Sequence, residues 1–163
     1  MTPTTPDDNH RWLHQLVGEW HYEMDSPEAG KTFTGRERVR KLGDLWVVGE
    51  SDMPTPDGTT GHAIITLGFD PKKRKFVGTW VGTMMPNLWV YEGELDAARR
   101  SLSLYSVGPA FDESCMPVGE GTSRYRDTIE LHGPDRRTFT GAVQQPDGTW
   151  KQFMKSDYRR TGS

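Results

Sequence analysis

The chain has 163 residues, with 20 Lys and Arg against 23 Asp and Glu, a formal charge of −3 and one cysteine. This length is typical of a single domain, and the near-balanced charge argues against nucleic acid as a partner, because binding phosphates needs a basic surplus on one face. The longest apolar run has four residues (88–91), whereas a membrane helix needs about 18, so we expect a soluble protein without a membrane partner.

The amino-terminal segment MTPTTPDDN has no basic region and no apolar segment of the kind that a secretory signal carries. Cys115 has no intrachain partner, so we expect a reducing, cytoplasmic compartment. No His or basic residue adjoins Cys115, which is therefore interpreted as inert rather than reactive. Residues 1–8 are expected to be a disordered tail, and residues 9–160 a single domain.

Apolar residues recur at helical spacing from Trp12 to Val17, and Asp8 or Asn9 is available as an N-cap. This pattern predicts one short amphipathic helix over residues 8–17.

From residue 19 onward, short alternating runs are separated by turn-forming residues. Nine such breaks predict about ten strands, near residues 19–25, 32–41, 44–53, 61–69, 75–82, 88–95, 101–107, 122–132, 137–145 and 149–159. The connections are of hairpin length except for 108–121.

A ten-stranded meander would expose two long edges unless it closed on itself. The sequence therefore predicts an all-β fold, a closed up-and-down antiparallel barrel of about ten strands with a short N-terminal helix. Because side chains completely fill a barrel of about eight strands, ten strands predict an internal cavity; an aromatic core that fills the interior is the alternative. A two-sheet sandwich is the alternative architecture, and only 108–121 is long enough to switch sheets.

Several short motifs occur in a particular order, among them LVGEW (16–20), VRKLGDLWVVGE (39–50), TLGFDP (66–71) and LWVYEG (88–93). In this order the chain resembles, over nearly its whole length, the bacterial family catalogued as domain of unknown function 1579. The resemblance implies a calycin-like barrel, related in shape to lipocalins and fatty-acid-binding proteins. It implies no established activity and no catalytic residue.

Side chains alternate between the faces of a strand, so a charged series marks the outward face and its neighbours point inward. The arginines of 32–41 thereby place Glu37 inside, and the charges of 122–132 place Asp127 inside. Trp150 is likewise predicted inside. The predicted interior ligand-binding residues are Trp20, Tyr22, Glu37, Trp80, Trp89, Tyr91, Tyr125, Asp127, Gln152, Met154 and Tyr158. In the third, fourth and ninth predicted strands, the charges do not show which side chains point inward, so the orientation of Glu50 and His62 stays unassigned.

A buried carboxylate needs a partner. Glu37 and Asp127 could therefore bind a cationic or hydroxylated ligand, or act as general acid and base with a raised pKa. The structural alternatives are hydrogen bonds to inward tyrosines, Gln152 or free backbone, a pair with a buried cation, or a β-bulge that turns one of them into solvent.

His10 and His14 are four residues apart on the predicted helix, but no third ligand follows at a usable spacing, so no metal is expected. His62 is interpreted as a surface residue. The motifs of the common hydrolases, nucleotide-binding proteins and metalloproteases are missing, and no cofactor is expected.

Three functional hypotheses follow. The first is binding of one small, partly apolar molecule with aromatic character in the barrel interior. The second is an enzyme that catalyses isomerisation or cyclisation, with Glu37 and Asp127 as acid and base and Tyr125 or Tyr158 positioning the substrate. The third is a structural or interaction module, for example a homodimer joined through Phe153 on the outer face.

Overall fold

The computed structural model describes residues 2–25, 30–55, 57–112 and 117–163, which form a short helical segment and ten strands. The helix α1 (Asp8–Leu13) continues into a 3-10 turn (His14–Leu16). The strands are β1 (Gly18–Asp25), β2 (Thr32–Leu42), β3 (Trp46–Pro54), β4 (Thr60–Asp70), β5 (Lys75–Gly82), β6 (Met85–Leu95), β7 (Ser101–Phe111), β8 (Pro117–Leu131), β9 (Arg136–Gln144) and β10 (Trp150–Gly162).

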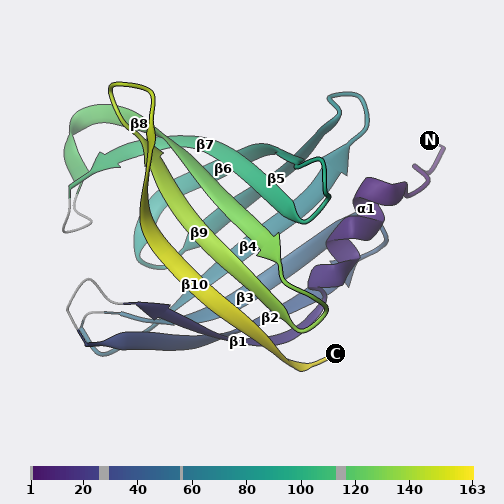
Figure 1. Ribbon diagram of the computed structural model, residues 1–163, viewed down its shortest axis with the longest axis horizontal. Helices are drawn as coiled ribbons and strands as arrows, with labels where there is room; N and C mark the ends of the chain where they lie inside the picture. Colours follow the sequence, from purple (N-terminus) through teal and green to yellow (C-terminus); the bar gives the residue numbers. More distant parts are fainter. Residues whose placement is uncertain (1, 26–29, 56, 113–116) are drawn as a thin grey trace.

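The strands form a closed barrel (Figure 1) in which each pairs antiparallel with its neighbours in the chain and β1 pairs with β10. The β1–β10 pairing joins the two edges that an open meander would leave free. The predicted all-β, up-and-down barrel with a short N-terminal helix is therefore confirmed, and the sandwich alternative is wrong.

The segment 108–121, predicted as a long connection, is mostly strand. β7 extends to Phe111 and β8 begins at Pro117, so this hairpin projects beyond the neighbouring strands. The Gly and Pro residues that indicated a loop are tolerated in this part of β7, because β7 is paired with β8 but no longer with β6 beyond Tyr105. Cys115 lies outside the described residues.

The helix covers one end of the barrel, with Asp7, rather than Asp8 or Asn9, as its N-cap. The Asp7 carboxylate accepts hydrogen bonds from two backbone N–H groups of the first turn. Farther along, the Trp12 indole N–H donates to the Arg99 carbonyl at 2.7 Å, which ties the helix to the β6–β7 turn. No helix in the described part of the chain is long and apolar enough to cross a membrane.

The barrel interior differs between its two ends. Beneath the helix lies the packed half, whose inward side chains are buried: Trp20, Val39, Val47, Leu67, Phe76, Leu102 and Ile129. At the other end lies the open half, whose inward apolar side chains stay half-buried: Met24, Phe33, Met53, Trp80, Trp89 and Met154. Since these side chains face the interior and still contact solvent, water reaches the end of the barrel opposite the helix.

The structure also resolves the strands whose phase the sequence left open. Glu50 and His62 point outward, and the His62 ring lies 3.0 Å from Asp52 Oδ1 on the outer surface. In β9, Arg137 points inward, where it reaches Glu37 on β2, across β10 and β1.

Candidate functional site

Most of the residues that were predicted to face the interior from the alternation of charged side chains do so. Ten of them lie on inward positions of their strands, as the burial patterns and register show: Trp20, Tyr22, Glu37, Trp80, Trp89, Tyr91, Tyr125, Asp127, Met154 and Tyr158. The structure divides these ten between the packed half and the open half, so they do not form one cluster.

The predicted inward orientation of Gln152 and Trp150 is wrong. A β-bulge between Gln152 and Met154 shifts the register of β10 against β9 and reverses the alternation before it. The Trp150 ring consequently lies on the outer face, stacked under the Arg126 guanidinium at 4.7 Å, and Gln152 is an exposed residue of that face.

Phe153 is the extra residue of this bulge, and it was not among the predicted interior residues. Its ring lies edge-on to Tyr125, with centroids 6.1 Å apart, and its tip would lie 2.9 Å from a Cβ at Gly141 on the inward face of β9. Phe153 therefore turns toward the mouth of the barrel rather than onto the outer face proposed for a dimer. The adjacent apolar pair Phe153–Met154 was the signal in the sequence.

In the packed half, Glu37 is paired with a buried cation. Arg137 Nη2 donates to Glu37 Oε1, and the Ser51 hydroxyl donates to Oε2 at 2.8 Å. The guanidinium lies between two rings, 4.6 Å from Trp20 and 4.1 Å from Tyr158. Both oxygens of Glu37 are thus occupied by protein donors, as in the structural alternative, and Arg137 is the partner that sequence reasoning missed.

Two tyrosines complete this cluster. The rings of Tyr22 and Tyr158 stack at 5.0 Å, and the Tyr22 hydroxyl donates to the Asp52 carbonyl at 2.7 Å. Burial, with a contribution from the Glu37 charge, raises the pKa of Tyr22 to about 12 and that of Tyr158 well above its usual 10. Both phenols stay neutral at physiological pH and serve as packing groups.

Asp127 has different surroundings. It is half-buried at the floor of the open half, in one rung with Leu104 and Gly141. The Tyr91 hydroxyl donates to its Oδ2 at 2.5 Å. Burial raises the pKa of Asp127 from 3.8 to about 6, opposed by the hydrogen bond from Tyr91. This carboxyl therefore titrates close to neutral pH.

An aromatic cluster extends from Asp127 toward the mouth of the barrel. Trp89 lies edge-on to Tyr125 with centroids 5.0 Å apart, and Phe111 lies 6.3 Å from Trp89. The Trp89 indole N–H is directed to the Met85 sulfur, and the Tyr125 hydroxyl donates to the Pro109 carbonyl. These contacts fix the rings, so their faces and edges form a preorganised apolar surface.

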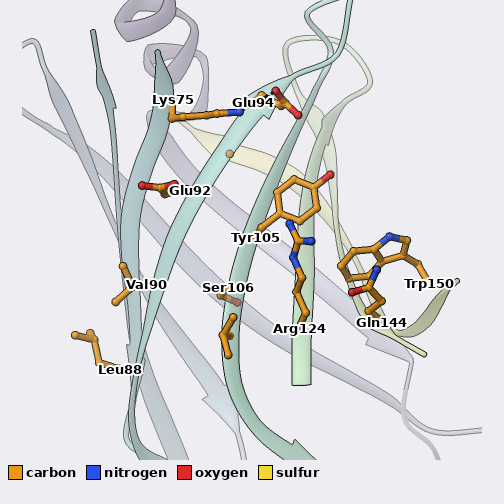
Figure 2. A pocket seen from close by; sticks show the side chains of 12 residues that line it. Lys75, Leu88, Val90, Glu92, Glu94, Tyr105, Ser106, Arg124, Gln144 and Trp150 are labelled. Atoms are coloured by element: carbon orange, nitrogen blue, oxygen red, sulfur yellow. Dashed lines mark hydrogen bonds and ion pairs between the residues drawn. The ribbon is translucent and has the colours of Figure 1, made fainter. Parts of the chain in front are cut away.

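Outside the wall, a groove of about 660 Å³ runs along the boundary between β6 and β7. The ladder between these strands ends at the Glu92–Tyr105 pair, and Figure 2 shows Tyr105 beside Arg124, with Trp150 on the far side. Exposed apolar side chains of β6, such as Val90, line the opposite wall. A second hollow of about 590 Å³ lies beside α1. Neither hollow is lined by the ten interior residues.

The histidines have local structural contacts. His10 is buried between Asp7 and the Phe69 carbonyl, 3.0 Å and 3.1 Å away, and His14 lies 3.0 Å from the Asp44 carbonyl. Within the residues that the structure describes, no three His, Cys, Asp or Glu side chains come together as a metal site.

Comparison with known proteins identifies a family. Among solved structures, the chain is similar to a redesigned β-barrel (12% identity, TM-score 0.47, covering 93% of this chain and 96% of that one). It is also similar to a de novo designed fluorescence-activating β-barrel (11% identity, TM-score 0.47, covering 91% and 96%). No curated protein matches the chain. Residues 5–160 match the family model described as a protein of unknown function, DUF1579. The chain therefore belongs to the DUF1579 family.

Proposed function

We propose that the protein binds one small, partly apolar molecule with an aromatic ring in the open half of the barrel. The observation that carries the proposal is that Trp80, Trp89 and Met154 face inward and stay half-buried in the open half, which also holds the Asp127 carboxyl. Apolar side chains that face an interior and contact water gain about 25 cal/mol per Å² when a ligand covers them.

The closed fold supports this proposal because it holds the binding surface rigidly. The packed half and the helix form a filled end of the barrel, so a ligand enters from the other end only. Small-molecule sites typically combine apolar walls with a few polar groups that fix orientation. Here the walls are aromatic, and the polar groups are Asp127 and the Tyr91 hydroxyl bonded to it.

The geometry favours binding over a mechanism with two carboxylates. Glu37 is buried, and Arg137 and Ser51 donate to its two oxygens, so its contacts are with the protein itself. Among the described residues, the titratable group in contact with Asp127 is the Tyr91 phenol, whose own pKa is raised well above 10 by burial. In this proposal, the Asp127 carboxyl, next to aromatic side chains, helps to bind the ligand and does not act as a catalytic group.

The test uses N-phenyl-1-naphthylamine, a neutral dye whose fluorescence rises in apolar surroundings. Titration into the protein should give saturable 1:1 binding with a micromolar dissociation constant. Trp80→Ala should weaken binding about tenfold because it removes one of the aromatic side chains that would contact the ligand in the open half.

Trp150→Ala is the matched control, since it removes a tryptophan from the outer groove. Binding that is lost in Trp150→Ala and retained in Trp80→Ala would move the site to the outer groove and refute the proposal. Thermal melting of each variant verifies that it folds.

A further inference from the structure

We infer that the ligand of the open half is an organic cation, a protonated amine on an apolar body, and that Asp127 is its counter-ion. The inference rests on the proposed function and specifies the chemistry of the same site. It follows from the charge around Asp127, from the direction of its free oxygen and from the rings beside it.

The first step is the charge balance. Among the described residues, no Lys, Arg or His forms an ion pair with Asp127, whereas Glu37 has Arg137. The groups that shift the pKa of Asp127 include no positive charge. A carboxylate held away from water without a cation is unfavourable, and a cationic ligand would supply the missing partner.

The second step is the direction of the carboxyl group. Tyr91 donates to Oδ2, whereas Oδ1 points toward Gly141 on the next strand. A Cβ at Gly141 would lie 3.3 Å from Asp127 Oδ1, 3.3 Å from Met154 Cε and 2.9 Å from the tip of the Phe153 ring. A carboxylate oxygen, a thioether methyl and the tip of an aromatic ring thus pack together over Gly141, which is buried and has no side chain to hold them apart. Oδ1, unlike Oδ2, has no hydrogen-bond donor among the described residues and is not one of the fully buried atoms.

The third step is the aromatic surface beyond this point. Phe153 contacts Tyr125, Tyr125 contacts Trp89, and Trp89 contacts Phe111. These rings meet one another edge-on or tilted and form an apolar surface beside the carboxylate. The unpaired carboxylate therefore favours an ammonium group and repels an anion, and the rings favour a ligand with an apolar body.

The preference for an amine over a permanently quaternary ammonium comes from Oδ1, because an acceptor gains most from a ligand that donates an N–H. The apolar body of the ligand would then cover Trp80 and Trp89. Asp127 would thus bind the ammonium group, and the two tryptophans would bind the apolar body.

The experiment compares three probes with one ring system: 2-naphthylmethylammonium, 2-naphthylmethanol and 2-naphthoate. By calorimetry at pH 7.5, the ammonium should bind about 10- to 100-fold more tightly than the alcohol, the effect expected of a hydrogen bond to a charged group. The naphthoate should bind most weakly.

Asp127→Asn should reduce the advantage of the ammonium over the alcohol to about threefold or less. The matched control is Glu92→Gln, which removes a carboxylate from the outer face one residue away from Tyr91. This variant should retain the wild-type order of affinities.

A pH series keeps the test decisive if Asp127→Asn does not fold. The groups gathered around Asp127 are Tyr91 on β6, Gly141 on β9, and Phe153 and Met154 on β10, of which Tyr91 alone titrates, with a pKa well above 10. The wild-type affinity for the ammonium should fall about tenfold between pH 7.5 and pH 5, because one unit below a pKa of about 6 leaves about a tenth of the carboxyl ionised. The affinity for the alcohol should not change.

The outcomes separate the two proposals. Equal affinities of the ammonium and the alcohol at pH 7.5, or an ammonium affinity that does not fall between pH 7.5 and pH 5, overturn the inference and leave the proposed function intact. Failure of all three probes to bind in the millimolar range overturns both.

Discussion

The two halves of the barrel each hold one inward carboxylate, and the two carboxylates have opposite surroundings. Glu37, in the packed half, is bonded to Arg137 and to Ser51. Asp127, at the floor of the open half, has the neutral hydroxyl of Tyr91 and no ion pair among the described residues.

This difference shows how the same sequence signal can have two physical meanings. Both residues interrupt an outward charged series in the same way, so alternation alone places both inside. The partner on another strand decides the role, because a buried charge with a buried counter-charge is a structural pair, whereas a half-buried charge without one is available to a ligand.

The difference between the two carboxylates predicts that the largest loss of stability will follow a substitution of Arg137. Arg137→Met leaves Glu37 buried without a cation and removes the guanidinium between Trp20 and Tyr158. We expect a loss of about 3–5 kcal/mol in the free energy of unfolding, measured by urea denaturation at pH 7. Arg36→Met, on the exposed face of β2, is the control and should change stability by less than about 0.5 kcal/mol.

The double variant Glu37→Gln/Arg137→Met sharpens this prediction. It removes both charges, so it should recover a large part of the stability lost in the single variant. A single variant as stable as the wild type would mean that the Glu37–Arg137 pair is not a structural element of the packed half.

The second prediction compares apolar side chains of the two halves. Leu102 is 0% exposed in the packed half, and Leu102→Ala should cost about 3 kcal/mol through lost burial and an unfilled cavity. Met154 is half-buried in the open half, and Met154→Ala should cost less than about 1 kcal/mol because water already reaches it. Equal losses in thermal or urea denaturation would show that the open half is packed as well.

Much of the fold follows from the sequence because turn residues and alternation are local signals. The ten strands and the closed barrel were predicted from them, and alternating arginines placed Glu37 inside. In β9 the same method fails, because Arg136 and Arg137 are adjacent and both are basic, so neither marks the outward face. The partner of Glu37 is 100 positions away in the sequence, and no local pattern reports that contact.

The errors on β10 have a related cause. A bulge adds one residue to a strand without changing its composition, so the alternation that assigned Met154 correctly misassigned Gln152 and Trp150 on the other side. The inward turn of Phe153, which contributes to the candidate site, depends on this irregularity.

The third prediction concerns the pH dependence of stability. The pKa of Asp127 in the folded protein, about 6, lies above the ordinary value of 3.8, so ionisation opposes folding. This penalty is fully present above pH 6 and disappears as the pH falls toward 4.

Asp127→Asn should therefore be more stable than the wild type at pH 7, on the order of 1–2 kcal/mol when screening by solvent is allowed for. The two proteins should converge near pH 4. Urea denaturation at several pH values measures the difference. Curves that stay parallel from pH 4 to pH 7 would contradict the assigned titration of Asp127.

The fourth and smallest effect concerns Tyr91, whose hydroxyl is the hydrogen-bond partner that the described residues give to Asp127. This hydrogen bond stabilises the carboxylate, so Tyr91→Phe should raise the pKa of Asp127 above 6, as followed by the ¹³C chemical shift of the carboxyl group in an NMR titration. Stability at pH 7 should fall by about 1 kcal/mol. The Glu37 carboxyl provides an internal reference, since it lies in the other cluster and its resonance should be unchanged. If the pKa of Asp127 stayed constant or fell, the Tyr91 hydroxyl would not be donating to the carboxylate, and the open half would hold its charge by some other contact.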